Sequence, residues 1–369
     1  MMEIAQLEIR TINLPLVRPF RTSFGTQKSR EVLILKLTTV DGVVGWAECV
    51  AMSEPLYSSE YLAGSLDLMR RFLIPALRAA GDITAEEVAS ILSPYLGSPM
   101  AKATLETALL DAQLRAEKRS LAEYLGANKA KIPCGVSVGI AQSIPDLMEE
   151  VSGYIADGYK RIKLKIEPGW DLEPVGEVRR NWPEIPLQVD ANQAYSRSDG
   201  ELLARLDQFD LLLIEQPLDE HDILGHAQLA KEVHTPICLD ESITSLRSAQ
   251  DALALKATSI INIKPGRVGG YLEAVKIHDL CLNEGVPVWC GGMLETGIGR
   301  AANVALAALP GFTLPGDTSA SSRFFQRDIT EPFVMEDGYL QVPTSPGIGR
   351  EPELEFLESI TSQKENIQF

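Results

Sequence analysis

Five charged residues in the middle of the chain recur at almost one interval. Lys165, Asp190, Glu215 and Asp240 are each 25 residues apart, and Lys264 follows 24 residues later. This interval is about the length of one strand, one helix and two loops. If each residue closes a strand, parallel strands bring three carboxylates and two lysines to the same end of a barrel. Such a group of charges predicts metal-assisted proton transfer.

The three carboxylates each follow an apolar segment that we interpret as a strand, in Val189-Asp-Ala-Asn192, Ile214-Glu-Gln-Pro217 and Leu239-Asp-Glu-Ser242. A single acid in this position usually caps the next helix. Three that converge repel one another strongly unless a cation lies among them. Oxygen ligands, without His or Cys at these strand ends, favour Mg²⁺ over zinc, with Mn²⁺ or another divalent ion as a substitute. The sequence therefore predicts a divalent metal site.

The lysines also follow a pattern. The segment Lys160-Arg-Ile-Lys-Leu-Lys-Ile166 alternates polar and apolar residues, which places Lys163 and Lys165 on one face of a strand. A solvated edge strand would give the same pattern, but a strand inside a parallel barrel has no solvated face, so both lysines would point into the barrel mouth. Lys264, after the sixth strand, would lie on the opposite side. Two lysines so placed can remove a proton from one side of a carbon and return it on the other.

A lysine base must be neutral near pH 7, and a nearby cation lowers its pKa because it disfavours the charged form. Lys163 can act in this way on Lys165, and Arg267 on Lys264. Arg267 can equally be only an anion contact.

The composition excludes some classes of protein. The chain has 369 residues, 45% of them hydrophobic, so it can bury one large domain and a smaller one. Its net charge of −17 argues against a nucleic-acid partner. No segment reaches the roughly 18 apolar residues that span a bilayer, and the five cysteines are not spaced as a redox or zinc pair, so we expect buried thiols. We expect a cytoplasmic homo-oligomer that acts on a small carboxylate substrate, without a membrane partner.

Periodicity predicts an α/β architecture. The first 50 residues predict three strands, at 4–14, 31–40 and 43–49, with a loop at 18–26, and 58–126 has helical spacing. After Pro133, short apolar strands alternate with amphipathic helices, and their spacing predicts a barrel rather than a doubly wound sheet. The eight predicted strands are 135–139, 161–166, 187–189, 211–214, 237–239, 259–263, 286–290 and 312–314.

These features resemble the enolase superfamily, in the branch that contains muconate lactonizing enzymes; that superfamily is known to pair a Lys or His base with Mg²⁺. The resemblance covers nearly the whole chain. It implies a modified TIM barrel, (β/α)₇β, at 129–322, an α+β capping domain at 1–128, and a C-terminal segment, 323–369, that returns to the cap. It implies metal ligands at Asp190, Glu215 and Asp240, an acid/base pair at Lys165 and Lys264, and Lys163 as an aid to Lys165 and a contact for the substrate carboxylate.

Three longer motifs are similar to the o-succinylbenzoate synthase and N-succinylamino acid racemase family. They are Gly291-Gly-Met-Leu-Glu-Thr-Gly-Ile-Gly-Arg-Ala-Ala-Asn303, Leu314-Pro-Gly-Asp-Thr-Ser-Ala-Ser321 and Lys264-Pro-Gly-Arg267. The similarity implies that segments 20–26 and 52–57 close over the site. The substrate contacts that we predict are Phe20, Phe24, Ser137, Asn192, Arg267, Gly292, Met293, Ile298 and Asp317. We also expect Gly297 to open a helix whose N-terminal amides face a substrate anion.

The implied chemistry is removal of a proton next to a carboxylate, through an enediolate. The family uses it for o-succinylbenzoate synthesis in menaquinone biosynthesis, for racemisation of N-acylamino acids, or for both. A muconate-type cycloisomerase and a dipeptide epimerase are alternatives. Dipeptide epimerases carry Asp-x-Asp where this chain has Asp317-Thr318-Ser319, so a substrate with an acylated or absent amino group is favoured. A barrel used only for binding is disfavoured because none of the five charges is lost.

Overall fold

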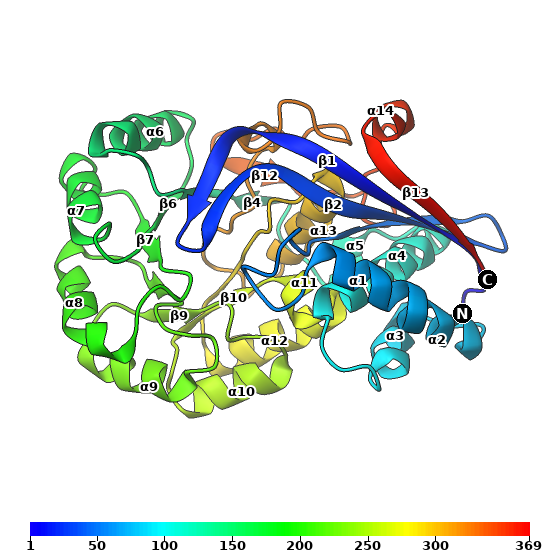
Figure 1. Ribbon diagram of the computed structural model, residues 1–369, viewed down its shortest axis with the longest axis horizontal. Helices are drawn as coiled ribbons and strands as arrows, with labels where there is room; N and C mark the ends of the chain where they lie inside the picture. Colours follow the sequence, from blue (N-terminus) through cyan, green and yellow to red (C-terminus); the bar gives the residue numbers. More distant parts are fainter.

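The computed structural model describes all 369 residues. Its cap is built on a four-stranded antiparallel sheet in the order β13-β1-β2-β3. The strands are β1 (Ile4–Thr22), β2 (Gly25–Thr39), β3 (Val44–Cys49) and β13 (Thr361–Gln368). The C-terminal strand, red in Figure 1, therefore lies beside the blue N-terminal strand. Where the predicted segments divide, at residues 128/129 and 322/323, stays a prediction.

The predicted loop at 18–26 is instead the tip of the long β1–β2 hairpin. Pairing continues through Phe20 with Gln27, Arg21 with Thr26 and Thr22 with Gly25, after a register shift that follows Pro15. The shift explains why the sequence suggested a break, because the alternation of buried and exposed side chains is interrupted there. The hairpin reaches over the end of the barrel (Figure 1).

Helices pack on one side of the cap sheet. A nearly continuous helix runs through α1 (Leu62–Leu68), a π-helical turn (Met69–Leu73) and α2 (Ile74–Ala80), and is followed by α3 (Ala85–Leu92), α4 (Pro99–Glu117) and α5 (Leu121–Leu125). Most of α4 is buried, because it lies between β3 and the barrel. Gly45 of β3 is required at this contact, since a side chain there would collide with the backbone of Ala108 and Ala112. The cap is thus packed tightly against the barrel through α4.

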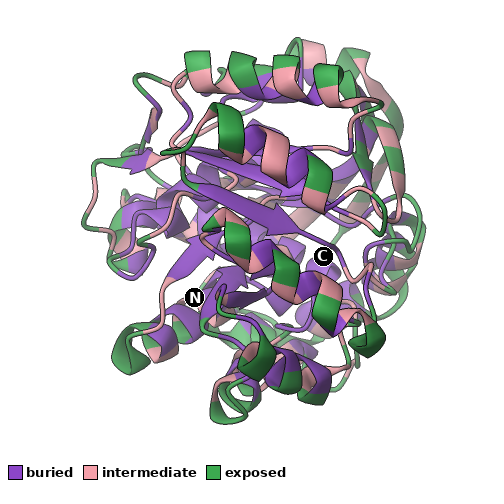
Figure 2. Cartoon of the chain, turned by 90° about the vertical axis from the view of Figure 1, so that its left-hand side faces the viewer, coloured by how far each residue is buried: buried purple, intermediate pink, exposed green.

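The barrel contains seven parallel strands in chain order. They are β5 (Gly135–Val138), β6 (Arg161–Lys165), β7 (Leu187–Asp190), β8 (Ile214–Glu215), β9 (Ile237–Leu239), β10 (Ile260–Ile263) and β11 (Val288–Cys290). The helices between and after them are α6 (Ile144–Ala156), α7 (Leu172–Asn181), α8 (Gly200–Ala204), α9 (Ile223–Glu232), α10 (Leu246–Ala254), α11 (Pro265–Val268), α12 (Tyr271–Glu284) and α13 (Gly297–Ala307). Figure 2 shows buried strands inside and helices with exposed outer faces around them.

The eighth predicted strand, 312–314, does not form. Isolated parallel bridges, Val288 with Phe312 and Cys134 with Gly316, take its place. The amide of Gly135 donates to the carbonyl of Gly316 at 2.7 Å, and the amide of Asp317 to that of Cys290 at 2.9 Å. The segment thus joins β11 to β5, but Pro315 has no amide to donate and limits the ladder.

The remaining elements complete the molecule. Asp337 and Gly338 form a tight turn before β12 (Tyr339–Gln341), which pairs with β4 (Lys131–Pro133), and α14 (Leu354–Ser359) precedes β13. All five cysteines are buried and free, as predicted. None of the helices combines the length and the apolar character that a membrane crossing requires.

Candidate active site

The strand register brings the predicted charges to one end of the barrel. Lys165 pairs directly with Asp190 across β6 and β7, and Asp190 with Glu215 across β7 and β8. Asp240 follows β9 and Lys264 follows β10. The 25-residue interval is therefore the distance along the chain between the ends of neighbouring strands. All five side chains are buried, the carboxylates almost completely.

Each buried carboxylate contacts a lysine. Lys163 Nζ lies 3.1 Å from Asp190 Oδ2 and 3.0 Å from Glu215 Oε2, so it bridges the two. Lys165 Nζ lies 2.5 Å from Asp190 Oδ2. On the other side of the barrel, Lys264 Nζ lies 2.7 Å from Asp240 Oδ2. The carboxylates are thus compensated by ammonium groups that come from strands on both sides.

The predicted metal ligands are not drawn together. No group of three or more acidic, His or Cys side chains converges as in a metal site. The donor set nevertheless fits a hard divalent cation, because Asp190, Glu215 and Asp240 are hard oxygen ligands at adjacent strand ends. The Lys163 ammonium bridges two of them as a cation would. Beside Asp240, the Oε2 atom of Glu241 is buried without a hydrogen-bond partner.

The two candidate bases differ in electrostatics. The pKa of Lys165 is lowered, chiefly because burial disfavours its charged form and partly because Lys163 lies nearby, as predicted. The corresponding prediction for Lys264 does not hold. Burial alone would lower the pKa of Lys264. The pKa is nevertheless raised above its ordinary value, because Tyr57 and nearby carboxylates, chiefly that of Glu241, favour the charged form. Arg267 is paired with Asp240 instead.

Asp317 is held by two buried cations. Its Oδ2 lies 2.7 Å from Lys163 Nζ, and its Oδ1 lies 2.9 Å from an Arg161 guanidinium nitrogen. Although burial would raise the pKa of Asp317, Lys163 and Arg161 hold that pKa well below its usual range. Arg161 also stacks on Trp289 and fills the space that the missing side chain of Gly135 leaves open. Both oxygens of Asp317 are therefore engaged within the protein.

Most predicted substrate contacts surround one cavity, of about 60 Å³. Those that line it are Phe20, Phe24, Ser137, Asn192, Gly292, Met293 and Asp317, together with Lys163, Lys165 and Lys264. Ile298, buried in α13, and Arg267 do not reach this cavity. The cavity is smaller than the roughly 300 Å³ or more of ordinary ligand sites, so substrate binding requires lining side chains or cap segments to move.

Two cap segments close the barrel mouth, as predicted. In the hairpin tip, the Ser23 hydroxyl lies 3.1 Å from the Ala191 carbonyl oxygen and 3.2 Å from that of Asn192, and Arg21 pairs with Glu167 at 2.7 Å. The segment after β3 brings Tyr57 to Lys264. The cap therefore forms one wall of the cavity.

The N-terminus of α13 does not face a substrate anion. Glu48 of β3 accepts hydrogen bonds from the amides of Thr296 and Gly299, at 3.0 and 3.1 Å, and Asp328 accepts from that of Gly297 at 2.8 Å. Carboxylates of the protein thus satisfy these amides. Burial, with a contribution from Glu295, raises the pKa of Glu48 to about 7.

Sequence reasoning did not single out Arg161, Glu241 or Asn262. Arg161 shares the inward face of Lys163 and Lys165, so the alternation that revealed the lysines contained this signal. Glu241 directly follows a predicted ligand. Asn262 donates to Glu215 Oε1 at 2.7 Å, and it lies two residues before Lys264, on the same face of β10.

Family models match both parts of the chain. Residues 5–126 match the N-terminal domain of mandelate racemase and muconate lactonizing enzyme, and residues 146–356 match the enolase C-terminal domain-like family. The chain is 60% identical over 364 residues to an N-succinylamino acid racemase from Amycolatopsis sp, covering 98% of this chain and 99% of the relative.

Another relative and a solved structure support the same family assignment. The chain is 45% identical over 354 residues to an o-succinylbenzoate synthase from Geobacillus kaustophilus, covering 96% of this chain and 94% of the relative. An enolase superfamily member from Listeria innocua, of solved structure, superposes with a TM-score of 0.96 at 42% identity over all of both chains. The chain therefore belongs to the enolase superfamily, in the family that contains o-succinylbenzoate synthases and N-succinylamino acid racemases.

Proposed function

We propose that this protein removes the proton next to the carboxylate of an N-acylamino acid and returns it on either face, as an N-succinylamino acid racemase. The observation that carries the proposal is that Lys165 and Lys264, at the ends of β6 and β10, line the same small cavity. A racemase needs one proton-transfer group on each side of the reacting carbon. The relative that is 60% identical bears this name.

The three lysines have different roles in this proposal. Lys165 takes the α-proton from one enantiomer and Lys264 returns a proton from the other side; for the opposite enantiomer the roles are exchanged. Lys163 contacts the substrate carboxylate, and it is suited to this because Asp317 supports its positive charge. Hydrophobic side chains of the cap, Phe20 and Phe24, limit the access of water.

Asp190, Glu215 and Asp240 would hold a divalent cation, which we propose to be Mg²⁺. When bound, this cation would stabilise the negative charge that the carboxylate gains as the enediolate forms. The five acidic groups around the site, Asp190, Glu215, Asp240, Glu241 and Asp317, are matched by five basic ones. An N-succinylamino acid brings two further negative charges, and a divalent cation would balance them.

A second activity, o-succinylbenzoate synthesis, is supported by the relatives of that name at 43–46% identity. In this dehydration Lys165 would take the proton and assist loss of hydroxide on the same face, while Lys264 remains cationic over the ring. This role would place the protein in menaquinone biosynthesis in the cytoplasm. We also propose that the chain assembles as a homo-oligomer, which the sedimentation of the purified protein would test.

The alternative activities are less well supported. A relative named L-Ala-D/L-Glu epimerase is 26% identical. A dipeptide epimerase must hold a free ammonium group, and both oxygens of Asp317 are already occupied by Lys163 and Arg161. Muconate lactonizing enzymes at 24% identity share the fold, and at that identity they support the fold alone.

The test is the optical rotation of enantiopure N-succinyl-phenylalanine over time, with enzyme and Mg²⁺, beside an EDTA control. Decay that requires the metal would support the racemase proposal. A Lys264→Ala variant is the matched control, because it keeps the carboxylates and Lys165 but should not racemise. A flat trace with the native enzyme would remove the racemase proposal and leave dehydration or cycloisomerisation.

A further inference from the structure

Tyr57 is the residue of the cap that reaches the barrel lysines. Its hydroxyl accepts hydrogen bonds from Lys264 Nζ at 3.1 Å and from Arg267 Nη1 at 3.4 Å, and it donates one to Asp240 Oδ1 at 3.2 Å. The Lys264 ammonium also lies 4.6 Å from the centre of the Tyr57 ring, within cation–π range. No other cap residue makes a polar contact with Lys163, Lys165 or Lys264.

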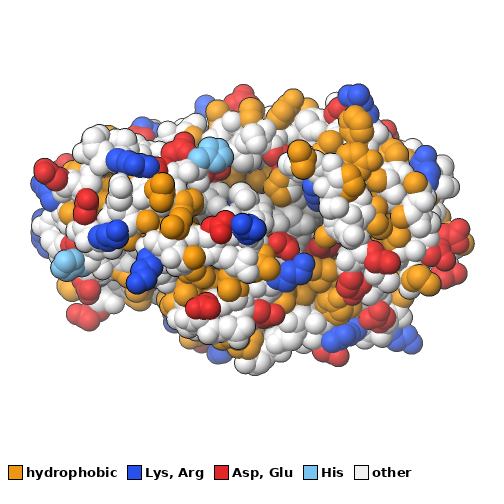
Figure 3. Space-filling model, turned by 90° about the horizontal axis from the view of Figure 1, so that it is seen from below, with side chains coloured by type: hydrophobic (Ala, Val, Ile, Leu, Met, Phe, Trp, Pro, Cys, Tyr) orange, Lys and Arg blue, Asp and Glu red, His pale blue; other side chains and the backbone are white.

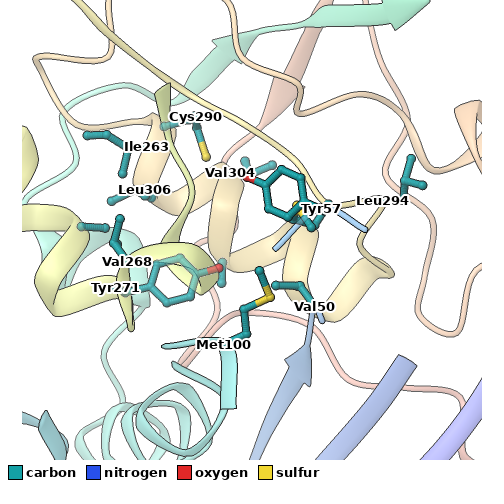
Figure 4. Close-up of a cluster of buried hydrophobic side chains, with 14 of the residues drawn as sticks. Val50, Tyr57, Met100, Ile263, Val268, Tyr271, Cys290, Leu294, Val304 and Leu306 are labelled. Carbon is teal, nitrogen blue, oxygen red and sulfur yellow. The ribbon is translucent and has the colours of Figure 1, made fainter. Parts of the chain in front are cut away.

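The Tyr57 side chain is buried at the junction of cap and barrel. Figure 4 shows its ring in a hydrophobic cluster that joins Val50 and Met100 of the cap to Ile263 and Cys290 of the barrel strands. Tyr57 also lines a second cavity, of about 480 Å³, whose wall includes Arg267. The surface is hollowed where cap and barrel meet (Figure 3). Tyr57 therefore lines both cavities, whereas Lys264 lines only the first.

The segment that carries Tyr57 is fixed at both ends. The amide of Leu62 donates to the Met52 carbonyl at 2.7 Å. Glu60, three residues after Tyr57, accepts hydrogen bonds from the amides of Met100 and Ala101 at the start of α4, both at 2.8 Å. The position of the Tyr57 hydroxyl is thus set by the cap.

Lys165 is held differently. Its Nζ donates to Asn192 Oδ1 at 2.5 Å, and the side-chain Nδ2 of Asn192 donates to Glu241 Oε1 at 2.9 Å. Asn192 and Glu241 both belong to the barrel, at the ends of β7 and β9. The uncharged partner of Lys165 therefore comes from the barrel, and that of Lys264 comes from the cap.

We propose that Tyr57 is a positioning residue that holds Lys264, but not Lys165, in place for proton transfer. The inference rests on the proposed racemase function. It means that the two proton-transfer steps depend differently on the cap, since only the Lys264 side requires the Tyr57 segment to be docked.

The test follows loss of the α-proton from each enantiomer of N-succinyl-phenylalanine in D₂O by NMR, with Tyr57→Phe and with native enzyme. Lys165→Ala and Lys264→Ala variants identify which enantiomer loses its proton to which lysine. Tyr57→Phe should slow exchange on the Lys264 side by about tenfold or more and change exchange on the Lys165 side by less than about twofold. Tyr61→Phe, in the same segment but 41% exposed, is the matched control and should change neither.

Equal slowing of both exchanges, or no slowing, would overturn the proposal. A crystal structure of the Tyr57→Phe variant gives a readout that does not depend on activity: Lys264 Nζ should move away from its position beside Asp240. If native enzyme exchanges neither enantiomer, the racemase proposal fails, and the crystal structure alone decides the role of Tyr57, because an unmoved Lys264 would contradict it.

Discussion

Asp317 Oδ2 lies 2.7 Å from Lys163 Nζ, a contact that joins the segment closing the barrel to its second strand. Asp317 also binds Arg161, so one carboxylate compensates two buried cations. Lys163 has two further carboxylate partners, Asp190 and Glu215, which are both predicted metal ligands. The contact with Asp317 ties Lys163 to a third carboxylate, which is not a predicted metal ligand.

Replacement of Asp317 by Asn should therefore impair both stability and activity. Removing one partner of a buried ion pair leaves an uncompensated charge, which costs on the order of 3 kcal/mol. The free energy of unfolding should fall by about this amount, and KM should rise because Lys163 loses one of its three carboxylate partners. Asp251→Asn, at an exposed pair with Arg247, is the control and should change little. Unchanged unfolding in Asp317→Asn would contradict the assigned role.

Arg267 should matter more for racemisation than for dehydration. It is buried, donates to the carbonyl groups of Ile243 and Asn262 at 2.7 and 2.6 Å, and contacts Asp240 and Tyr57 beside Lys264. Only racemisation requires Lys264 to exchange protons. Arg267→Gln should lower kcat/KM for N-succinyl-phenylalanine by at least about tenfold more than for o-succinylbenzoate formation. Equal losses of the two activities would exclude this selective role.

Metal removal should abolish both activities. EDTA should stop racemisation and dehydration, and Mg²⁺ should restore them. A second readout is independent of activity, because a ligand that binds only the folded state raises the melting temperature. Mg²⁺ should raise Tm in the native enzyme and in Asp251→Asn, but much less in Asp190→Asn. Activity that persists in EDTA would count against Asp190, Glu215 and Asp240 as ligands.

The pH dependence of stability should report on Glu106, buried in α4 at the N-terminus of α12. Burial raises the pKa of Glu106 to about 8, with a smaller contribution from Glu273 and opposed by Lys276 and by the amides of Tyr271 and Leu272. Between the ordinary pKa and about 8, the folded protein keeps a proton that the unfolded chain has lost. The stability that the Glu106 carboxyl contributes is therefore fully present below its ordinary pKa. It falls as pH rises from that value to about 8, by at most about 1.4 kcal/mol per pH unit.

Glu106→Gln should flatten this dependence. The measurement is Tm or the urea midpoint at pH 5 and pH 8. Glu284→Gln, an exposed position on α12, is the control and should keep the native slope. Since Glu48 titrates in the same range, the slope should be reduced but not removed. An unchanged slope in Glu106→Gln would show that its pKa is not raised.

Much of the candidate site was determined by the sequence alone. The spacing from Lys165 to Lys264 and the alternation at Lys163 identified the strand ends and their charged residues, because parallel strands joined by helices must end at one edge of the barrel. The motifs that include Gly292 and Asp317 identified the family. These signals are local and periodic, so they can be read without knowing which strands are neighbours.

Contacts between distant segments were decided only by the tertiary structure. Tyr57 meets Lys264 across 207 residues of sequence, and Glu48 meets Thr296 across 248. No periodicity links such pairs, because their distance depends on how the cap packs against the barrel. For the same reason the sequence could not show that Asp317 is shared by Lys163 and Arg161, or that the eighth strand is reduced to isolated bridges. Local patterns determined which side chains enter the barrel, and packing determined which partners hold them.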